Sequence, residues 1–173
     1  ILNSIWQLCK YSIKATSALG IYIDGDRERI PYEADAIINQ LSHYTTDREY
    51  AMGRRSSEYL LEHPTWPTEW ILQALIIAWN DYLYTGDKRS IEANYDILKA
   101  RTLQSLRREN GLISTTDDRV QSDEFKSSIR FYGNMRDIVD WPRCGDWPHG
   151  EDDHYHLTDY NTVVNAFHYR ALE

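Results

Sequence analysis

Residues 69–84 read Glu-Trp-Ile-Leu-Gln-Ala-Leu-Ile-Ile-Ala-Trp-Asn-Asp-Tyr-Leu-Tyr, and this stretch decides the fold class. Its apolar residues fall on most sides of a helix, which predicts a helix that is buried on most sides. Thr68 is expected to cap the start of this helix, and the sequence Thr85-Gly86-Asp87 is expected to end it. The stretch therefore predicts a helical core.

The rest of the chain carries helical periodicity as well, with Asp47 and Asp159 as the expected caps of two of the helices. Helices are expected over residues 1–18, 33–44, 48–62, 88–108, 124–129 and 160–172. No segment sustains the alternation of apolar and polar residues that marks a half-buried strand, so no substantial sheet is expected. Helical hairpins laid side by side predict an all-α chain that forms part of a toroid or solenoid.

Composition excludes several kinds of partner. The chain has 173 residues and a net charge of −8, and this charge argues against nucleic acid because phosphates favour a basic face. No apolar stretch approaches the roughly 20 residues of a membrane span, so no membrane partner is expected. The 13 Tyr and 6 Trp join a polar group to an apolar body, which suits wet surfaces such as sugar-binding clefts. The alternative is that they fill gaps in a helical core.

The two ends of the chain lie inside apolar-periodic segments, at residues 1–6 and 163–169. We interpret residues 1–173 as a single partial domain cut from a longer protein. Such a piece leaves apolar helix faces uncovered, and exposed patches of that kind usually find a partner. We therefore expect the chain to self-associate.

Residues 24–35, Asp-Gly-Asp-Arg-Glu-Arg-Ile-Pro-Tyr-Glu-Ala-Asp, place five acids and two arginines on a loop that enters a helix. One interpretation is a solvated, charge-rich loop with local salt bridges. The other is a glycosidase site, because glycoside hydrolysis needs one carboxylic acid that donates a proton and one carboxylate that activates water or attacks. Both interpretations stay open on spacing alone.

A family resemblance favours the second interpretation. Asp24, Arg27-Glu28-Arg29 and Asp35, followed by His63-Pro-Thr-Trp-Pro-Thr-Glu-Trp70 and by Asp140-Trp141, resemble the catalytic domain of bacterial α-L-rhamnosidases. The family pattern continues from the glutamate to an aromatic residue four positions on, which is Tyr32 here where the family often has Trp. The resemblance implies an (α/α)6 barrel, of which this chain forms roughly the first half.

The resemblance also implies roles for individual residues. Glu28 would be the general acid of an inverting hydrolysis of terminal α-L-rhamnosides, and Asp24 and Asp35 would accept hydrogen bonds from rhamnose hydroxyls. The general base would lie outside this chain, so the isolated chain is expected to be inactive. The other predicted substrate contacts are Tyr32, Trp66, Glu69, Asp140 and Trp141.

Several alternatives remain at this stage. Glu69 is equally well explained as a first-turn acid that the helix dipole favours. The loop from His149 to His156 holds three His and three acids, but its spacing fits no zinc signature, so we expect neither a metal nor a cofactor. The chain could also belong to another (α/α)6 glycosidase, or to a non-catalytic helical module that binds carbohydrate or serves as a scaffold.

Overall fold

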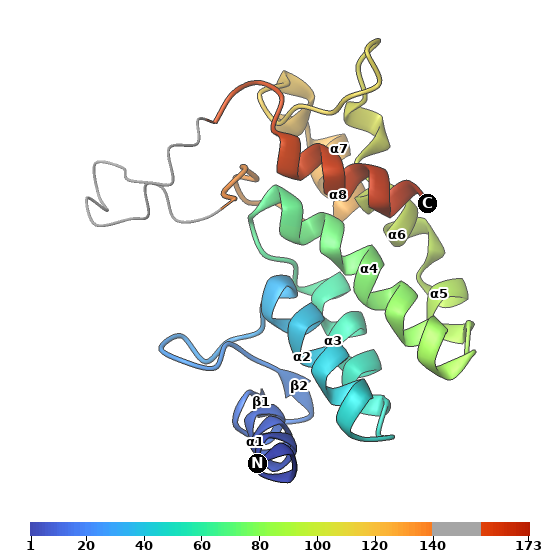
Figure 1. The fold of residues 1–173 in the computed structure, drawn as a ribbon. Helices are drawn as coiled ribbons and strands as arrows, with labels where there is room; N and C mark the ends of the chain where they lie inside the picture. Colours follow the sequence, from blue (N-terminus) through green and yellow to red (C-terminus); the bar gives the residue numbers. More distant parts are fainter. Residues whose placement is uncertain (140–156) are drawn as a thin grey trace.

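The computed structural model describes residues 1–139 and 157–173, and this part of the chain is mainly helical (Figure 1). Five longer helices are α1 (Leu2–Ala15), α2 (Glu33–Thr46), α3 (Ala51–Glu62), α4 (Thr68–Thr85) and α8 (Thr162–Leu172). Shorter elements are α5 (Arg89–Ala93), α6 (Tyr95–Arg101), α7 (Asp123–Ile129) and the 3-10 turns η1 (Gln104–Leu106) and η2 (Asp118–Gln121). The prediction of an all-α fold class is confirmed.

The helices alternate in direction along the chain. α4 packs against α2 on one side and α8 on the other, and these three helices run the same way across Figure 1. α3 packs against α2 and α4, α6 packs against α4, and both run the opposite way. This arrangement confirms the predicted helical hairpins. That the chain forms the first half of a six-hairpin ring stays a prediction.

α4 is the centre of the fold, as its sequence predicts. It contributes to each of three apolar clusters: one with α6, α7 and α8, one with α1, α2 and α3, and one with α3 and α6. The α4 side chains in these clusters are Ile71, Leu72, Ala74, Ile77 and Ala78. Because these residues cover several faces of one helix, α4 is enclosed by its neighbours on most sides.

A two-stranded antiparallel sheet leads into the acidic loop. β1 (Ser17–Ala18) pairs with β2 (Ile21–Tyr22), and the turn between them has positive φ at Leu19 and Gly20. Tyr22 is fully buried, its N–H donates to Ser56 Oγ at 2.9 Å, and its hydroxyl lies 2.8 Å from His43 Nδ1. The last residue before the loop is therefore fixed to both α2 and α3.

Some helix boundaries differ from the sequence expectation. The expected helix over 88–108 breaks into α5, α6 and η1. Asn94, with φ of −114° and ψ of 16°, separates α5 from α6, and Leu103, with a left-handed φ of 59°, separates α6 from η1. Tyr95, which helical spacing places on the same face as Ile91 and Leu98, is 59% exposed. Asn161 caps α8 in place of Asp159, and its Oδ1 accepts the Val163 N–H at 2.9 Å. Asp47 ends α2 and does not start α3.

The apolar residues of α1 lie largely at the surface. The exposed ones are Leu2, Ile5, Trp6, Leu8 and Tyr11. Neither α1 nor any other helix within the described ranges has the length and apolar character needed to cross a membrane. The predicted self-association of the chain through such faces stays a prediction.

Candidate functional site

The acidic loop between β2 and α2 is organised by the Asp24 side chain. Asp24 Oδ2 accepts the backbone N–H groups of Asp26 at 3.1 Å, Glu28 at 3.2 Å and Arg29 at 3.3 Å. Partial burial raises the pKa of Asp24, but these N–H groups and the Arg29 charge outweigh it and hold the pKa below its usual value. The carboxylate therefore stays ionised, and its other oxygen makes no hydrogen bond to the described residues.

Arg29 fixes the far side of this loop. Its backbone is left-handed, with φ of 56°, a conformation that is costly for a residue with a side chain. Its guanidinium donates from Nη1 to the Ala15 carbonyl at 2.8 Å, at the end of α1. The Asp24 amide adds a backbone bond to the Ile30 carbonyl at 2.8 Å. The loop is thus held in shape before any ligand arrives.

Glu28 lies exposed at the tip of the loop. Its Oε1 accepts a hydrogen bond from Arg27 Nη2 at 2.6 Å, while its Oε2 makes no hydrogen bond to any residue in the described ranges. The Arg27 side chain is 74% exposed, so this ion pair is weak and a ligand can displace it. Glu28 can therefore present a carboxyl oxygen to a bound molecule.

Tyr32 and Asp35 bring the start of α2 to the same place. Burial raises the pKa of Asp35, and the charges of Asp24 and Glu28 raise it further. Burial also raises the pKa of Tyr32, with smaller contributions from the same two acids and Asp35. The charges of Asp24 and Glu28 act on both Tyr32 and Asp35, and we name these four residues the acidic cluster.

The start of α4 lies beside the acidic cluster. The Tyr32 ring meets the Trp70 ring edge-on, with centroids 5.4 Å apart. Trp66, in the turn before α4, is half-buried, and the Arg136 guanidinium lies 4.6 Å from the centroid of its ring. Figure 1 shows the 24–31 loop and the starts of α2, α4 and α8 on the same side of the molecule. Trp66 therefore belongs to the same end of the helices as the cluster.

Glu69 faces away from solvent and holds a backbone segment. It is 2% exposed, and its Oε1 accepts the N–H groups of Ile138 at 3.3 Å and Val139 at 2.5 Å. Burial and the Asp137 charge raise its pKa, and the hydrogen bonds from these N–H groups act in the opposite direction. The carboxylate anchors the chain just before Asp140 and Trp141. A sugar contact by Glu69 stays a prediction.

We expect Glu69→Ala to release this anchored segment. The buried Ile138 N–H and the part-buried Val139 N–H lose the Glu69 carboxylate, and the loss at the buried group costs about 1–3 kcal/mol. Amide hydrogen exchange of Ile138 and Val139 should then speed up by about tenfold or more. The matched control is Glu92→Ala, which removes an exposed glutamate paired with Lys88. Unchanged exchange at both amides in Glu69→Ala would contradict the anchoring role.

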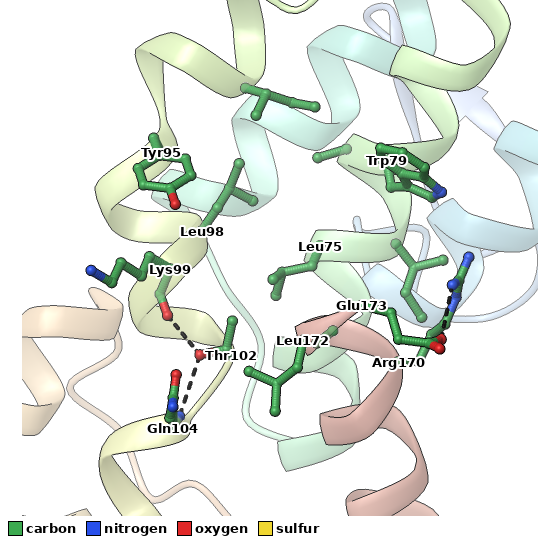
Figure 2. A pocket seen from close by; sticks show the side chains of 14 residues that line it. Leu75, Trp79, Tyr95, Leu98, Lys99, Thr102, Gln104, Arg170, Leu172 and Glu173 are labelled. Atoms are coloured by element: carbon green, nitrogen blue, oxygen red, sulfur yellow. Dashed lines mark hydrogen bonds and ion pairs between the residues drawn. The ribbon is translucent and has the colours of Figure 1, made fainter.

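A pocket of about 370 Å³ lies elsewhere, between α4, α6 and the end of α8 (Figure 2). Its walls are mostly apolar, and the Arg170–Glu173 ion pair lies at one side. Labelled residues include Leu75, Trp79, Tyr95, Leu98 and Leu172. None of its lining residues belongs to the predicted sugar site, so the pocket and the acidic cluster are separate features.

Residues 1–173 match the family described as the bacterial alpha-L-rhamnosidase six-hairpin glycosidase domain. The chain belongs to this family. No curated protein and no solved structure matches it. The helical hairpins of the described residues agree with the hairpin architecture that the family description names.

The structure places the predicted site residues in two groups. Glu28 and the rest of the acidic cluster lie together, and Trp66 and Glu69 lie in and beside the adjoining turn. Asp140, Trp141 and the loop from His149 to His156 lie outside the described residues. Within residues 1–139 and 157–173, no group of three or more His, Cys, Asp or Glu side chains is arranged to hold a metal ion.

Three further residues lie at this end of the helices and were not predicted as site residues. Trp70 contacts Tyr32, Arg136 covers Trp66, and Thr65 donates two hydrogen bonds to Glu33. Trp70 lies inside the motif of residues 63–70, and this position could have identified it as a site residue. Arg136 is 70 positions from Trp66, and no local pattern links them.

Proposed function

We propose that the intact protein hydrolyses terminal α-L-rhamnosyl residues with inversion, with Glu28 as the general acid. The observation that carries this proposal is the acidic cluster: three carboxylates and a tyrosine brought together on one loop and helix start in a chain of the rhamnosidase family. The proximity of these side chains to the start of α4, where Trp66 and Trp70 lie, supports a site over a loop that is only solvated (Figure 1).

The proposed step is proton transfer from Glu28 to the leaving glycosidic oxygen while water attacks the opposite face of the sugar. In inverting enzymes the acid and the base stand about 6.5–9.5 Å apart to leave room for that water. Glu28 suits the acid role because it is exposed and its Oε2 is available. The base stays a prediction, expected from outside this chain.

The rest of the cluster would orient the sugar. Asp24 presents an ionised carboxylate on a preformed loop, and Asp35 lies beside it, so both can accept hydrogen bonds from ring hydroxyls. Tyr32 and Trp66 offer aromatic surface. Rhamnose carries a methyl group in place of a hydroxymethyl, and an aromatic wall suits that methyl. Asp140 and Trp141 complete the predicted set.

L-Rhamnose binding should weaken as the pH falls through the pKa of Asp35. An ionised Asp35 accepts hydrogen bonds from the sugar, and protonation removes that charge. Because burial and the Asp24 charge raise this pKa, the loss should begin at a higher pH than for an ordinary aspartate, whose pKa is about 3.9. NMR titration of the chain with L-rhamnose at several pH values measures the effect.

The control for this pH dependence is Asp35→Asn. This variant should bind L-rhamnose more weakly at neutral pH, and its affinity should change much less over the same acidic range. If Asp35→Asn keeps both the affinity and the pH profile of the natural chain, Asp35 does not contact the sugar.

Hydrolysis assays on the intact protein test the whole proposal. p-Nitrophenyl α-L-rhamnoside should be cleaved in preference to a panel of other p-nitrophenyl glycosides. NMR of the first-formed product should show the β anomer, as inversion requires. Preference for another sugar would indicate a different (α/α)6 glycosidase, and no turnover of any glycoside would favour a non-catalytic module.

A further inference from the structure

Glu33 is a buried acid at the edge of the acidic cluster. It is the first residue of α2, directly after Tyr32, and it is 0% exposed. Both of its carboxylate oxygens bond to one residue: Oε1 accepts the Thr65 N–H at 3.1 Å, and Oε2 accepts the Thr65 hydroxyl. Glu33 therefore faces the turn between α3 and α4 and cannot donate a proton to a bound sugar.

The turn that Glu33 holds carries Trp66. Thr65 precedes Trp66 directly, and the Trp66 carbonyl accepts the Arg136 N–H at 3.3 Å. The Arg136 carbonyl in turn accepts the Thr68 N–H at 3.0 Å. The turn is thus bonded on one side to the 136 segment and on the other to the start of α2 through Glu33.

The cost of burying Glu33 suggests that its hydrogen bonds to Thr65 do more than stabilise the fold. Burial raises the pKa of Glu33, while the Thr65 hydrogen bonds and the buried Arg101 charge partly offset that cost. Replacing a buried charged group with a well-packed apolar side chain is often neutral or stabilising. A carboxylate, in contrast, accepts two hydrogen bonds in a fixed geometry and so sets the direction of the chain at Thr65.

We propose that Glu33 is a positioning residue: by binding Thr65 through both carboxylate oxygens, it sets where the Trp66 indole stands relative to Tyr32 and Asp35. The inference rests on the proposed function only in taking rhamnose as the ligand that the indole meets. Glu33 itself would not touch the sugar, and its effect would pass through Thr65.

The sharpest test changes Thr65. Thr65→Val removes the hydroxyl that bonds to Glu33 and keeps the size of the side chain, whereas Thr65→Ser keeps the hydroxyl. We expect Thr65→Val and Glu33→Gln to shift the NMR resonance of the Trp66 indole N–H, assigned with Trp66→Phe. We expect both to weaken L-rhamnose binding by about 3- to 10-fold. Thr65→Ser should retain the natural resonance and affinity.

Asp81→Asn is the matched control for a general loss of stability in the fold. Asp81 is also buried and accepts from the Tyr44 hydroxyl at 2.8 Å and from Arg54 Nε at 2.9 Å, near the other end of α4. This variant should leave the Trp66 resonance unchanged. An equal shift in Asp81→Asn, or an unshifted resonance in Thr65→Val, would overturn the proposal. If the natural chain does not bind L-rhamnose, the expected contact between Trp66 and the sugar is wrong. The shift of the Trp66 indole N–H resonance then tests by itself whether Glu33 positions Trp66.

Discussion

We expect Glu28→Gln to lower the turnover of an α-L-rhamnoside by the intact protein by about 10²–10⁴-fold, the usual contribution of general acid catalysis. The amide has nearly the same shape as the carboxyl group and keeps an oxygen for Arg27, but it has no proton to deliver. Binding of the substrate should change little, so the loss should appear in kcat and not in KM.

The leaving group makes this test more specific. p-Nitrophenolate departs with little protonation, so Glu28→Gln should lose less activity on p-nitrophenyl rhamnoside than on a rhamnoside of a simple alcohol. Arg27→Gln is the control, and it should change turnover only a few-fold because the Arg27–Glu28 pair is exposed. Equal losses on the two substrates would speak against proton donation. Unchanged turnover would remove Glu28 from the role and leave Asp24 and Asp26 to test.

Arg101→Met should lower the free energy of unfolding by about 3–5 kcal/mol, because three buried carbonyls lose a hydrogen-bond donor at about 1–3 kcal/mol each. Arg101 is 0% exposed and donates to the carbonyls of Leu60 at 2.9 Å, Leu61 at 2.7 Å and Ile129 at 3.2 Å. Burial lowers its pKa to about 10, so it stays charged at neutral pH. Its loss leaves three buried carbonyls without their donor and removes the positive charge that favours the ionised form of Glu33.

Urea unfolding followed by far-UV circular dichroism measures this change. The control is Arg170→Met, which removes an exposed arginine of α8 paired with Glu173 and should have no measurable effect. In the double variant Glu33→Gln, Arg101→Met, part of the lost stability should return, because the buried Glu33 carboxylate is also removed. A loss of less than 1 kcal/mol in Arg101→Met would show that the network relaxes without it.

The fold could be predicted from sequence wherever the apolar residues of one segment recur at helical spacing. The expected helix over 69–84 is observed over Thr68–Thr85, because its apolar residues fix both its type and its burial. Prediction failed where tertiary contacts override a local pattern. Leu103 takes a left-handed backbone and sits fully buried in the cluster formed by α4 and α6–α8, so the apolar spacing over 88–108 does not yield one helix.

The site divides in the same way. Arg27-Glu28-Arg29 and Asp35 lie within one short segment, so the family resemblance could mark them as a group, whereas spacing alone does not decide between a site and a solvated loop. The hydrogen bonds between Glu33 and Thr65 join residues 32 positions apart, and the one between Glu69 and Val139 joins residues 70 positions apart. A single sequence holds no signal for such pairs, because either glutamate also fits a helix first turn. Only the folded chain distinguishes an acid that faces solvent from one that holds the backbone.

The central place of α4 has a consequence for cooperativity. In a solenoid each repeat contacts only its neighbours, and one repeat can open while the others stay folded. Here one helix supplies side chains to all three apolar clusters, so no cluster can come apart without exposing part of α4. The described chain should therefore open as one unit, with its α4 amides exchanging only in the globally unfolded state. The loops at the start of α4 then keep their geometry for as long as the whole chain stays folded.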